Sequence, residues 1–335
     1  MFYSLSRRTQ AVALLIAVVG CTQDGLAPSA GEKPNQSQPP AHTATVLPGL
    51  PPNSWSVATA MPSGREAFVT ATVNGVIYAI GGAVGGKAID TVQAYDPVMH
   101  TWSNRPRLPR RRMDPSGAAV INGEIYVTGG QDSIFITKTL FVYNPATKLW
   151  KWKKSLPVPS RAGVSVAIGG KLYVYTPEGA VYQGAAHLHR YDPDTDRWTE
   201  LATPPSGHER GAGGAINGKF YLAGGVGTGS SNSLHMYNPA TNQWKSRPSM
   251  PTARFDAAGA VYQGKLWVLG GTNDIDDYDV VQVYDPTSKS WTTKTHMPTK
   301  RFSFAASVAD GLLYALGGRI DATSTTIATN EVYIP

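Results

Sequence analysis

Six arginines recur along the chain at near-regular intervals and carry the clearest potential for ligand chemistry. They are Arg65, Arg112, Arg161, Arg210, Arg254 and Arg301. A guanidinium group binds a carboxylate through two parallel hydrogen bonds, so clustered arginines would suit carboxylates or acidic sugars. The same recurrence is also what a scaffold role predicts, in which each arginine bonds carbonyl or acidic groups of a neighbouring repeat. Because an arginine occurs in every repeat, we expect the scaffold role for most of them.

Register within the repeats selects the arginines that we expect to contact a ligand. Arg65, Arg254 and Arg301 each lie nine residues before the Asn, Gln or Asp of the next tight turn, and His208 holds that position in the fourth repeat. These side chains should therefore project from equivalent places, with His208 as a neutral or titrating alternative. Together with Arg210, they are the predicted ligand-binding residues.

Few other residues are candidates for catalysis or metal binding. Glu178 and Glu209 are the unusual carboxylates near the predicted binding loops, and they are weak candidates for acid–base catalysis. His187 and His189 lie two residues apart, so on a strand both would point to the same face. Two histidines could ligate a metal, but no third ligand is identifiable from the sequence. We therefore expect surface histidines here, and we predict no metal and no cofactor.

The elements that position these residues repeat with the aromatic side chains. Trp55, Trp102, Trp150, Trp198, Trp244 and Trp291 are 46 to 48 residues apart. A tyrosine stands seven residues before each of the last five, and an Asp-Pro or Asn-Pro pair directly follows that tyrosine. Such pairs favour type I turns, because the short side chain bonds the backbone ahead and Pro presets φ. Tyr therefore ends one strand and Trp belongs to the next, and both should lie in the core of the repeat.

A second hairpin precedes that turn in every repeat. Its turn is a pair such as Asn74-Gly75 or Asn122-Gly123, which tolerates positive φ, and the strand after it ends in Gly-Gly in five of six repeats. Each repeat therefore supplies four strands, A to D in chain order, with about 47 residues per unit. Four-stranded units at this period are typical of propeller blades.

The Gly-Gly doublet and the spaced Tyr and Trp closely resemble the signature of kelch repeats, over residues 53–335. The resemblance implies an all-β fold, a six-bladed propeller of four-stranded antiparallel blades. The first repeat begins with a D-like strand around Trp55, and the last ends at a C-like strand around Tyr333. We therefore expect residues 53–59 to supply the outer strand of the last blade and close the ring.

The loops divide between two faces, because successive strands alternate in direction. A–B and C–D turns are short and share one face, whereas the D–A connections and the long, dissimilar B–C loops share the other. Variable loops on a rigid scaffold commonly carry binding specificity. The face with the B–C and D–A loops is therefore the predicted binding face.

The N-terminus carries an export signal rather than part of the fold. Residues 1–20 hold Arg7 and Arg8 followed by a short apolar run, as secretory signals do. The run ends in Val18-Val19-Gly20-Cys21, which resembles the lipobox of bacterial lipoproteins and predicts lipid attachment at Cys21. Residues 21–52 are rich in Pro, Ser and Gln and predict a flexible tether. We expect a lipid-anchored envelope protein, on the periplasmic side of the outer membrane or at the cell surface.

Composition limits the remaining function classes. Hydrophobic residues make up 41% of 335 residues, enough for a sizeable core, and charged residues only 16%. The single cysteine excludes an intramolecular disulfide, a cysteine-rich zinc site and an iron–sulfur cluster. The formal net charge of +7 is small, and the longest run of basic residues in the chain is three. No nucleic-acid partner is therefore expected. We expect a monomer that contacts the membrane only through its lipid.

Two functions follow from the resemblance. Kelch propellers most often bind other proteins, so we expect a protein- or glycan-binding module, with a protein or an anionic glycan as its ligand. The alternative is a sugar isomerase similar to the sialic acid (N-acetylneuraminate) mutarotases, which use a Glu and an Arg six residues beyond it. Here Glu178 is followed at that distance by Gly184. Copper radical oxidases, also kelch proteins, need a Cys–Tyr crosslink, which the position of Cys21 excludes.

Overall fold

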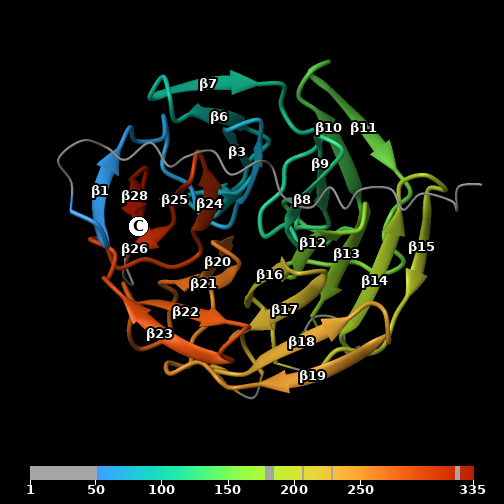
Figure 1. The fold of residues 1–335 in the computed structure, drawn as a ribbon. Helices are drawn as coiled ribbons and strands as arrows, with labels where there is room; N and C mark the ends of the chain where they lie inside the picture. The colour runs from blue at the N-terminus through green and yellow to red at the C-terminus, as the bar shows by residue number, and fades with distance from the viewer. Residues whose placement is uncertain (1–50, 178–184, 206, 228, 321–324) are drawn as a thin grey trace, which may run out of the picture. The chain divides into compact units, whose positions relative to one another are not determined.

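The computed structural model describes residues 51–177, 185–205, 207–227, 229–320 and 325–335, which form strands, turns and loops without a helix. Six four-stranded antiparallel sheets stand around a common axis as the blades of a propeller (Figure 1). The predicted all-β fold and the blade count are therefore confirmed. Within these described ranges, no helix has the length and apolar character needed to cross a membrane.

Each blade uses its strands in the order A to D from the axis outward. Blade 1 is β2 (Val69–Val73), β3 (Val76–Ile80), β6 (Val92–Asp96) and β7 (Thr101–Arg105). Blade 2 is β8 (Ala118–Ile121), β9 (Glu124–Thr128), β10 (Leu140–Asn144) and β11 (Leu149–Lys153). Blade 3 is β12 (Val164–Ile168), β13 (Lys171–Thr176), β14 (His187–Asp192) and β15 (Arg197–Glu200). Blades 4 and 5 are β16 (Ala212–Ile216), β17 (Lys219–Ala223), β18 (Leu234–Asn238) and β19 (Gln243–Arg247); and β20 (Ala258–Tyr262), β21 (Lys265–Leu269), β22 (Val281–Asp285) and β23 (Ser290–Lys294). Blade 6 is β24 (Ala305–Ala309), β25 (Leu312–Leu316), β28 (Asn330–Ile334) and β1 (Ser54–Ala58).

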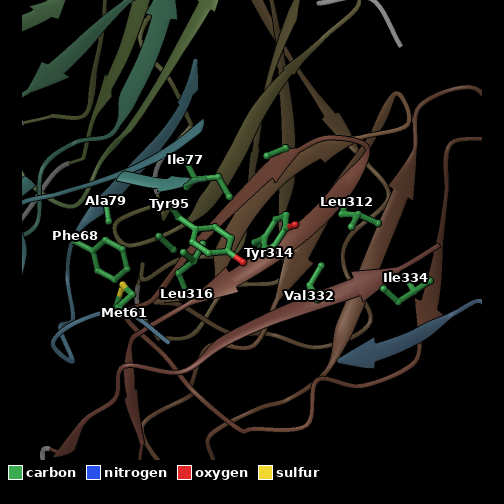
Figure 2. Close-up of a cluster of buried hydrophobic side chains, with 12 residues drawn as sticks. Met61, Phe68, Ile77, Ala79, Tyr95, Leu312, Tyr314, Leu316, Val332 and Ile334 are labelled. Atoms are coloured by element: carbon green, nitrogen blue, oxygen red, sulfur yellow. The ribbon is translucent and has the colours of Figure 1, made fainter. Parts of the chain in front are cut away.

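The sixth blade joins the two ends of the propeller, as the aromatic register predicted. Strand β1 pairs with β28 in antiparallel register, with Trp55 opposite Tyr333. Blades 6 and 1 both contribute side chains to the hydrophobic core between them. Tyr95 of blade 1 and Tyr314 of blade 6 lie there with ring centroids 5.9 Å apart (Figure 2). Strand β1 thus covers β28, and blade 6 has four strands like the other five blades.

The repeated Trp and Tyr residues join each blade to the one before it. The six tyrosines at the ends of the C strands are buried, and each packs against the Trp of the next strand at 4.8 to 5.3 Å. Each indole N–H then donates to a backbone carbonyl of the preceding blade at 2.7 to 3.1 Å. The expected placement of these aromatics in the blade cores is confirmed, and the hydrogen bonds add an outer ring of contacts between blades.

The Gly-Gly doublets make a second ring of contacts between blades. In blade 1 the N–H of Gly82 donates to the carbonyl of Arg112 in the next blade at 2.7 Å, and equivalent bonds end on Ser160, Arg254, Arg301 and Arg65. Gly82 has a φ of +101°, and a Cβ there would lie 2.6 Å from the carbonyl oxygen of Glu66. Only glycine fits this conformation and this close approach, which explains why the doublet recurs.

Candidate functional site

The long loops lie on one face of the propeller, which we call the loop face. It carries the B–C loops and the D–A loops, whereas the short A–B and C–D turns form the opposite turn face. The B–C loops of blades 1 and 6 contain short hairpins, β4 (Ala83–Val84) with β5 (Lys87–Ala88) and β26 (Arg319–Ile320) with β27 (Thr325–Thr326). The loop face is therefore braced locally, while the turn face is built from tight turns alone.

A closed ring of six residues lies where the D–A loops meet at the central channel, and we call it the mouth ring. Its members are Ala67, Asp114, Ala162, Arg210, Asp256 and Ser303. Each backbone N–H donates to the carbonyl of the ring member in the preceding blade, at 2.8 to 3.0 Å, so the chain of hydrogen bonds closes on itself. All six residues have positive φ, between 47° and 56°, a conformation that non-glycine residues adopt at a free-energy cost.

The polar side chains of the mouth ring face one depression in the loop face. Arg210 and Asp256 form an ion pair of 3.2 Å, and their side chains keep 39% and 13% of their surface exposed. Asp114 belongs to blade 2, on the opposite side of the ring from Asp256 in blade 5. These residues, with Ser303 and Gly211, line a cavity of about 140 Å³. The mouth ring therefore presents two carboxylates and one guanidinium to a ligand.

Below the mouth, the channel is lined by small residues of the A strands. Gly213, Gly214, Gly259 and Ala260 are among the residues around a space of about 260 Å³ that shares part of its wall with the depression. Small side chains fit here because the six A strands converge on the axis. Thr70 and Ser165 are among the residues around this space, but no charged side chain is, so the charged groups of this face belong to the mouth ring.

Burial in the mouth alters the ionisation of its carboxyl groups. Removal from water raises the pKa of Asp256 to about 6, although Arg210 opposes the shift and Asp114 reinforces it. Burial also raises the pKa of Asp114, against the attraction of Arg210 and Arg161. The carboxylate of Asp256 in turn raises the pKa of Arg210, which stays cationic. Carboxyl groups held near such a pKa are a common mark of functional sites.

Glu209 stands next to this ring, as its place beside Arg210 in the sequence predicted. Its backbone pairs with Val226 of the same blade, its side chain is half-buried, and its charge contributes to the raised pKa of Arg210. Arg161, on the neighbouring blade, donates from its guanidinium to the side-chain oxygen of Gln131 at 2.6 Å. Glu209 therefore lies beside Arg210 on the loop face but is not among the residues that line the depression.

Three of the four arginines predicted to bind a ligand lie inside the blades instead of at the mouth. Arg65, Arg254 and Arg301 have no exposed surface. Arg254 donates to the Val268 carbonyl at 3.1 Å and to the Gln282 side chain at 2.6 Å. Arg65 makes the corresponding bonds to carbonyls and to Gln93 within blade 1. Their burial agrees with a scaffold role, but the side chains bond groups of their own blade and not, as expected, of a neighbouring repeat.

Arg301 adds a buried ion pair to this arrangement. Its guanidinium lies 2.7 Å from the carboxylate of Glu331, with side-chain exposures of 0% and 1%. A second nitrogen donates to the Gly317 carbonyl at 3.1 Å. Arg301 therefore joins the B strand and the C strand of blade 6.

The mouth ring explains why the arginines fall into two registers. The buried scaffold positions are Arg65, Arg112, Ser160, His208, Arg254 and Arg301, and each mouth-ring residue follows one of them by two positions. Arg112 does not have the nine-residue spacing to its turn, because the segment before its A strand is one residue longer. Its carbonyl nevertheless accepts the same glycine bond as the carbonyls of the other scaffold residues. Arg210 is a mouth-ring residue, and His208 is the scaffold residue of blade 4.

His208 replaces the scaffold arginine with a neutral side chain. It is buried, and its Nδ1 donates to the Gly224 carbonyl at 2.7 Å, so its Nε2 accepts a 2.7 Å hydrogen bond from Nδ1 of His235. Burial lowers the pKa of His208 to about 4. His208 is neutral, yet it donates to a glycine carbonyl of its own blade as the scaffold arginines Arg65 and Arg301 do.

Two further predicted residues, Glu178 and Cys21, lie outside the described residues. The expectation that His187 and His189 lie at the surface is wrong for His189, which is only 2% exposed because it packs beside Trp198. Sequence reasoning also missed Asp114, Asp256 and Ser303. The signal that could have found them is their fixed offset of two residues from the scaffold positions.

The B–C loops around the mouth expose large apolar side chains. Ile134 and Phe135 of blade 2 are 73% and 67% exposed, and Ile275 of blade 5 is 88% exposed. In each loop the backbone is held by a side chain that accepts two N–H bonds, Asp132 in blade 2 and Asn273 in blade 5. The loop tips are thus presented by ordered turns.

Comparison with known proteins places this architecture in a family. The model for the KLHDC2/KLHL20/DRC7 Kelch-repeats domain matches residues 118–318, more than half of the chain, and a Kelch motif model matches residues 64–109. The solved structure described as "Structure of YjhT" superposes with a TM-score of 0.69 at 16% identity, covering 82% of this chain and 96% of that one. This likeness shows the fold.

Curated relatives match over shorter stretches. F-box protein AFR of Arabidopsis thaliana is 46% identical over 59 residues, which is 17% of this chain and 16% of that protein. F-box/kelch-repeat protein At1g16250 of the same organism is 32% identical over 106 residues, 31% of this chain and 26% of that protein. The matched stretch is therefore only a small part of these relatives. With its six Tyr and Trp repeats, five of which carry Gly-Gly, closed into one propeller and more than half of its length matched, the chain belongs to the kelch-repeat family.

Proposed function

We propose that this chain is a protein-binding module and that its partner docks on the loop face. The kelch propeller fold supports a protein-binding module in general. The observation that carries the choice of face is the combination of exposed apolar loop tips with a polar mouth between them. Protein interfaces commonly have apolar anchors surrounded by polar groups.

The apolar loop tips supply the anchors. Phe135 and Ile275 stand on blades 2 and 5, on opposite sides of the mouth ring. Removing such side chains from water on docking stabilises a complex by roughly 25 cal/mol per Å² of apolar surface. A partner that spans the mouth would contact both tips at once.

The mouth ring determines the chemistry of the polar contact. With both carboxylates ionised and Arg210 cationic, its formal charge is −1, from Asp114, Asp256 and Arg210. The scaffold arginines are buried in their blades and donate to carbonyls, so their donors do not face the mouth. We therefore favour a partner that inserts a basic side chain, and we favour a protein over an anionic glycan.

Paired surface variants test the proposal. The chain offers a matched pair, because Phe135 on the loop face and Met99 on the turn face are both 67% exposed. The full chain, as wild type, Phe135→Ala with Ile275→Ala, or Met99→Ala with Val98→Ala, is used for quantitative capture from an envelope extract and on a glycan array. We expect the loop-face variant to lose its protein partner at least tenfold and the turn-face variant to keep it.

The outcomes of this test are distinct. Asp114→Asn should also weaken capture, because it removes a charge that a basic side chain would contact. Equal capture by all variants would overturn the assignment to the loop face. Binding to acidic glycans that Arg210→Ala abolishes would replace the protein partner with an anionic glycan.

Sugar isomerisation is the second candidate, and the placement of Glu209 beside Arg210 on the loop face favours it. A carboxylate can transfer protons at an anomeric centre while a guanidinium holds the acid group of the sugar. The test is the rate of anomer exchange of N-acetylneuraminate, followed by NMR. Acceleration by the wild type that Glu209→Gln removes would establish this activity, and an uncatalysed rate would reject it.

We also propose that the propeller is anchored to the envelope through a lipid on Cys21. The support is the sequence alone, with the four-residue lipobox and the only cysteine of the chain. A lipidated N-terminus anchors without spanning the bilayer. Cys21→Ala should move the protein from the membrane fraction to the soluble fraction, and mass spectrometry of the wild type should find a diacylated cysteine. An unmodified wild-type Cys21 would contradict the proposal.

A further inference from the structure

We propose that His187, His189 and Glu200 of blade 3 form a binding site for one divalent transition-metal ion of the zinc class. The three side chains come from two adjacent strands, β14 and β15, outside the mouth ring. The proposal does not depend on the function of the loop face.

Strand register brings the three residues together. His187 and His189 are two apart on β14, so both point to the same face of the sheet. Glu200 is the last residue of β15 and stands directly opposite His189 in the antiparallel ladder. Directly opposed residues project to the same side of a sheet, so the two imidazoles and the carboxylate share one surface.

The distances suit a single ion. The candidate ligand atoms of the three residues all lie within 4.8 Å of one another. Nδ1 of His187 is 2.9 Å from the Glu200 carboxylate, and the two imidazole rings stack with centroids 5.5 Å apart. Tetrahedral bonds of about 2.0–2.2 Å place ligand atoms ~3.4 Å apart, which side-chain rotation alone can reach. The Glu200 side chain is 65% exposed, which leaves room for this rotation.

A second, independent observation comes from the buried histidine. His189 is only 2% exposed, and its Nδ1 is buried without a hydrogen-bond partner. The Thr176 hydroxyl is likewise buried and unpartnered, and Thr176 lies opposite His187 in the ladder, on the same side of the sheet. Buried polar atoms normally have partners, because leaving one unpaired is costly. An ion bound to Nδ1 would satisfy this nitrogen.

The chemistry of the three side chains also suits a metal ion. Neutral imidazole and carboxylate are the forms that ligate metal, and two His with one Glu is a ligand set of zinc sites that keep an open coordination position.

The protein contains a matched control for the simpler explanation, an ion pair without metal. His296 lies 3.0 Å from the Asp279 carboxylate, a contact like that of His187 with Glu200. Among the described residues, however, His296 and Asp279 belong to no cluster of three candidate metal ligands. If a histidine–carboxylate pair alone produced metal affinity, His296→Ala would reduce it as much as His187→Ala does.

Zinc titration of the full chain tests the proposal, with calorimetry for affinity and Co²⁺ absorption for geometry. A Cys21→Ala background excludes binding by the only thiol. We expect one Zn²⁺ per chain, and a loss of affinity of at least tenfold in Glu200→Gln, His187→Ala and His189→Ala. We expect no change in His296→Ala. Glu200→Gln alters an exposed residue, so its effect cannot come from misfolding.

Two results would overturn the site. One is the absence of stoichiometric Zn²⁺ binding by the wild type. The other is equal affinity in the wild type and Glu200→Gln, together with a Co²⁺ spectrum that Glu200→Gln leaves unchanged. A tetrahedral Co²⁺ spectrum that disappears in Glu200→Gln and persists in His296→Ala would establish it.

Discussion

The scaffold arginines show how one residue type can be repeated for stability and not for ligand contact. Arg254 and Arg301 have no exposed surface, and each donates to carbonyls in its own blade. Their own backbone carbonyls accept bonds from glycines of the preceding blade. Each therefore connects two blades, and loss of its side chain should affect folding first.

Arg301→Ala should strongly destabilise the protein. The change leaves the buried carboxylate of Glu331 without its cation, and breaking a buried pair typically costs about 3–5 kcal/mol. Arg107→Ala is the control, because Arg107 pairs with Asp90 but is 70% exposed, and exposed pairs contribute about 0–1 kcal/mol. Denaturant unfolding measures both, and equal stabilities of the two variants would contradict the scaffold role.

Asp256→Asn should stabilise the protein at pH 7.5 and have no effect near pH 4. The folded state raises the pKa of Asp256 to about 6, above the ~3.9 of an unfolded chain. The folded protein therefore binds the proton more tightly, and this contribution to stability is present below pH ~4 and lost as pH rises through 6. The neutral Asn variant avoids the loss.

Melting temperatures between pH 4 and 7.5 test this prediction. Asp276→Asn removes one exposed negative charge from a B–C loop and serves as the control. If the difference in melting temperature between Asp256→Asn and the wild type stays constant across this pH range, the mouth does not raise the pKa of Asp256.

At the scale of elements, the repeats were predictable and the mouth was not. Tyr and Trp spacing identifies the C and D strands, because these side chains must recur wherever a blade packs on its neighbour. The mouth ring has no such constraint on residue type: Ala67, Asp114 and Arg210 share a backbone conformation, not a side chain. Similarly, the third ligand candidate, Glu200, becomes visible only when the β14–β15 register is known.

Removal of residues 51–60 should destabilise the whole propeller. Strand β1 completes blade 6, and Trp55 donates to the Thr295 carbonyl of blade 5 at 3.0 Å. Without it, β28 becomes an exposed edge that can pair with other chains. We expect a loss of several kcal/mol or aggregation, measured by thermal melting and light scattering, compared with a chain that begins at Pro51. A truncated chain that melts like this control and stays monomeric would disprove the closure.

At the scale of the whole molecule, three sets of contacts hold the blades in a ring and leave one face free for recognition. Trp hydrogen bonds act at the rim, glycine–carbonyl bonds in the middle and the mouth ring at the axis. These contacts do not involve the tips of the B–C loops, so the B–C loops can vary in sequence. The alternating direction of the strands predicted this division of faces correctly, whereas the ligand depends on loop residues that follow no repeat.

Site-specific photocrosslinking tests the central claim, that a protein partner docks on the loop face, most directly. A photoreactive phenylalanine analogue replaces Phe135 or Ile275 on the loop face, and Met99 or Val98 on the turn face, all of which are at least 67% exposed. After irradiation in the native envelope, we predict one partner adduct from the two loop-face positions and none from the turn-face positions. Adducts from Met99 or Val98, with none from Phe135 and Ile275, would contradict the account.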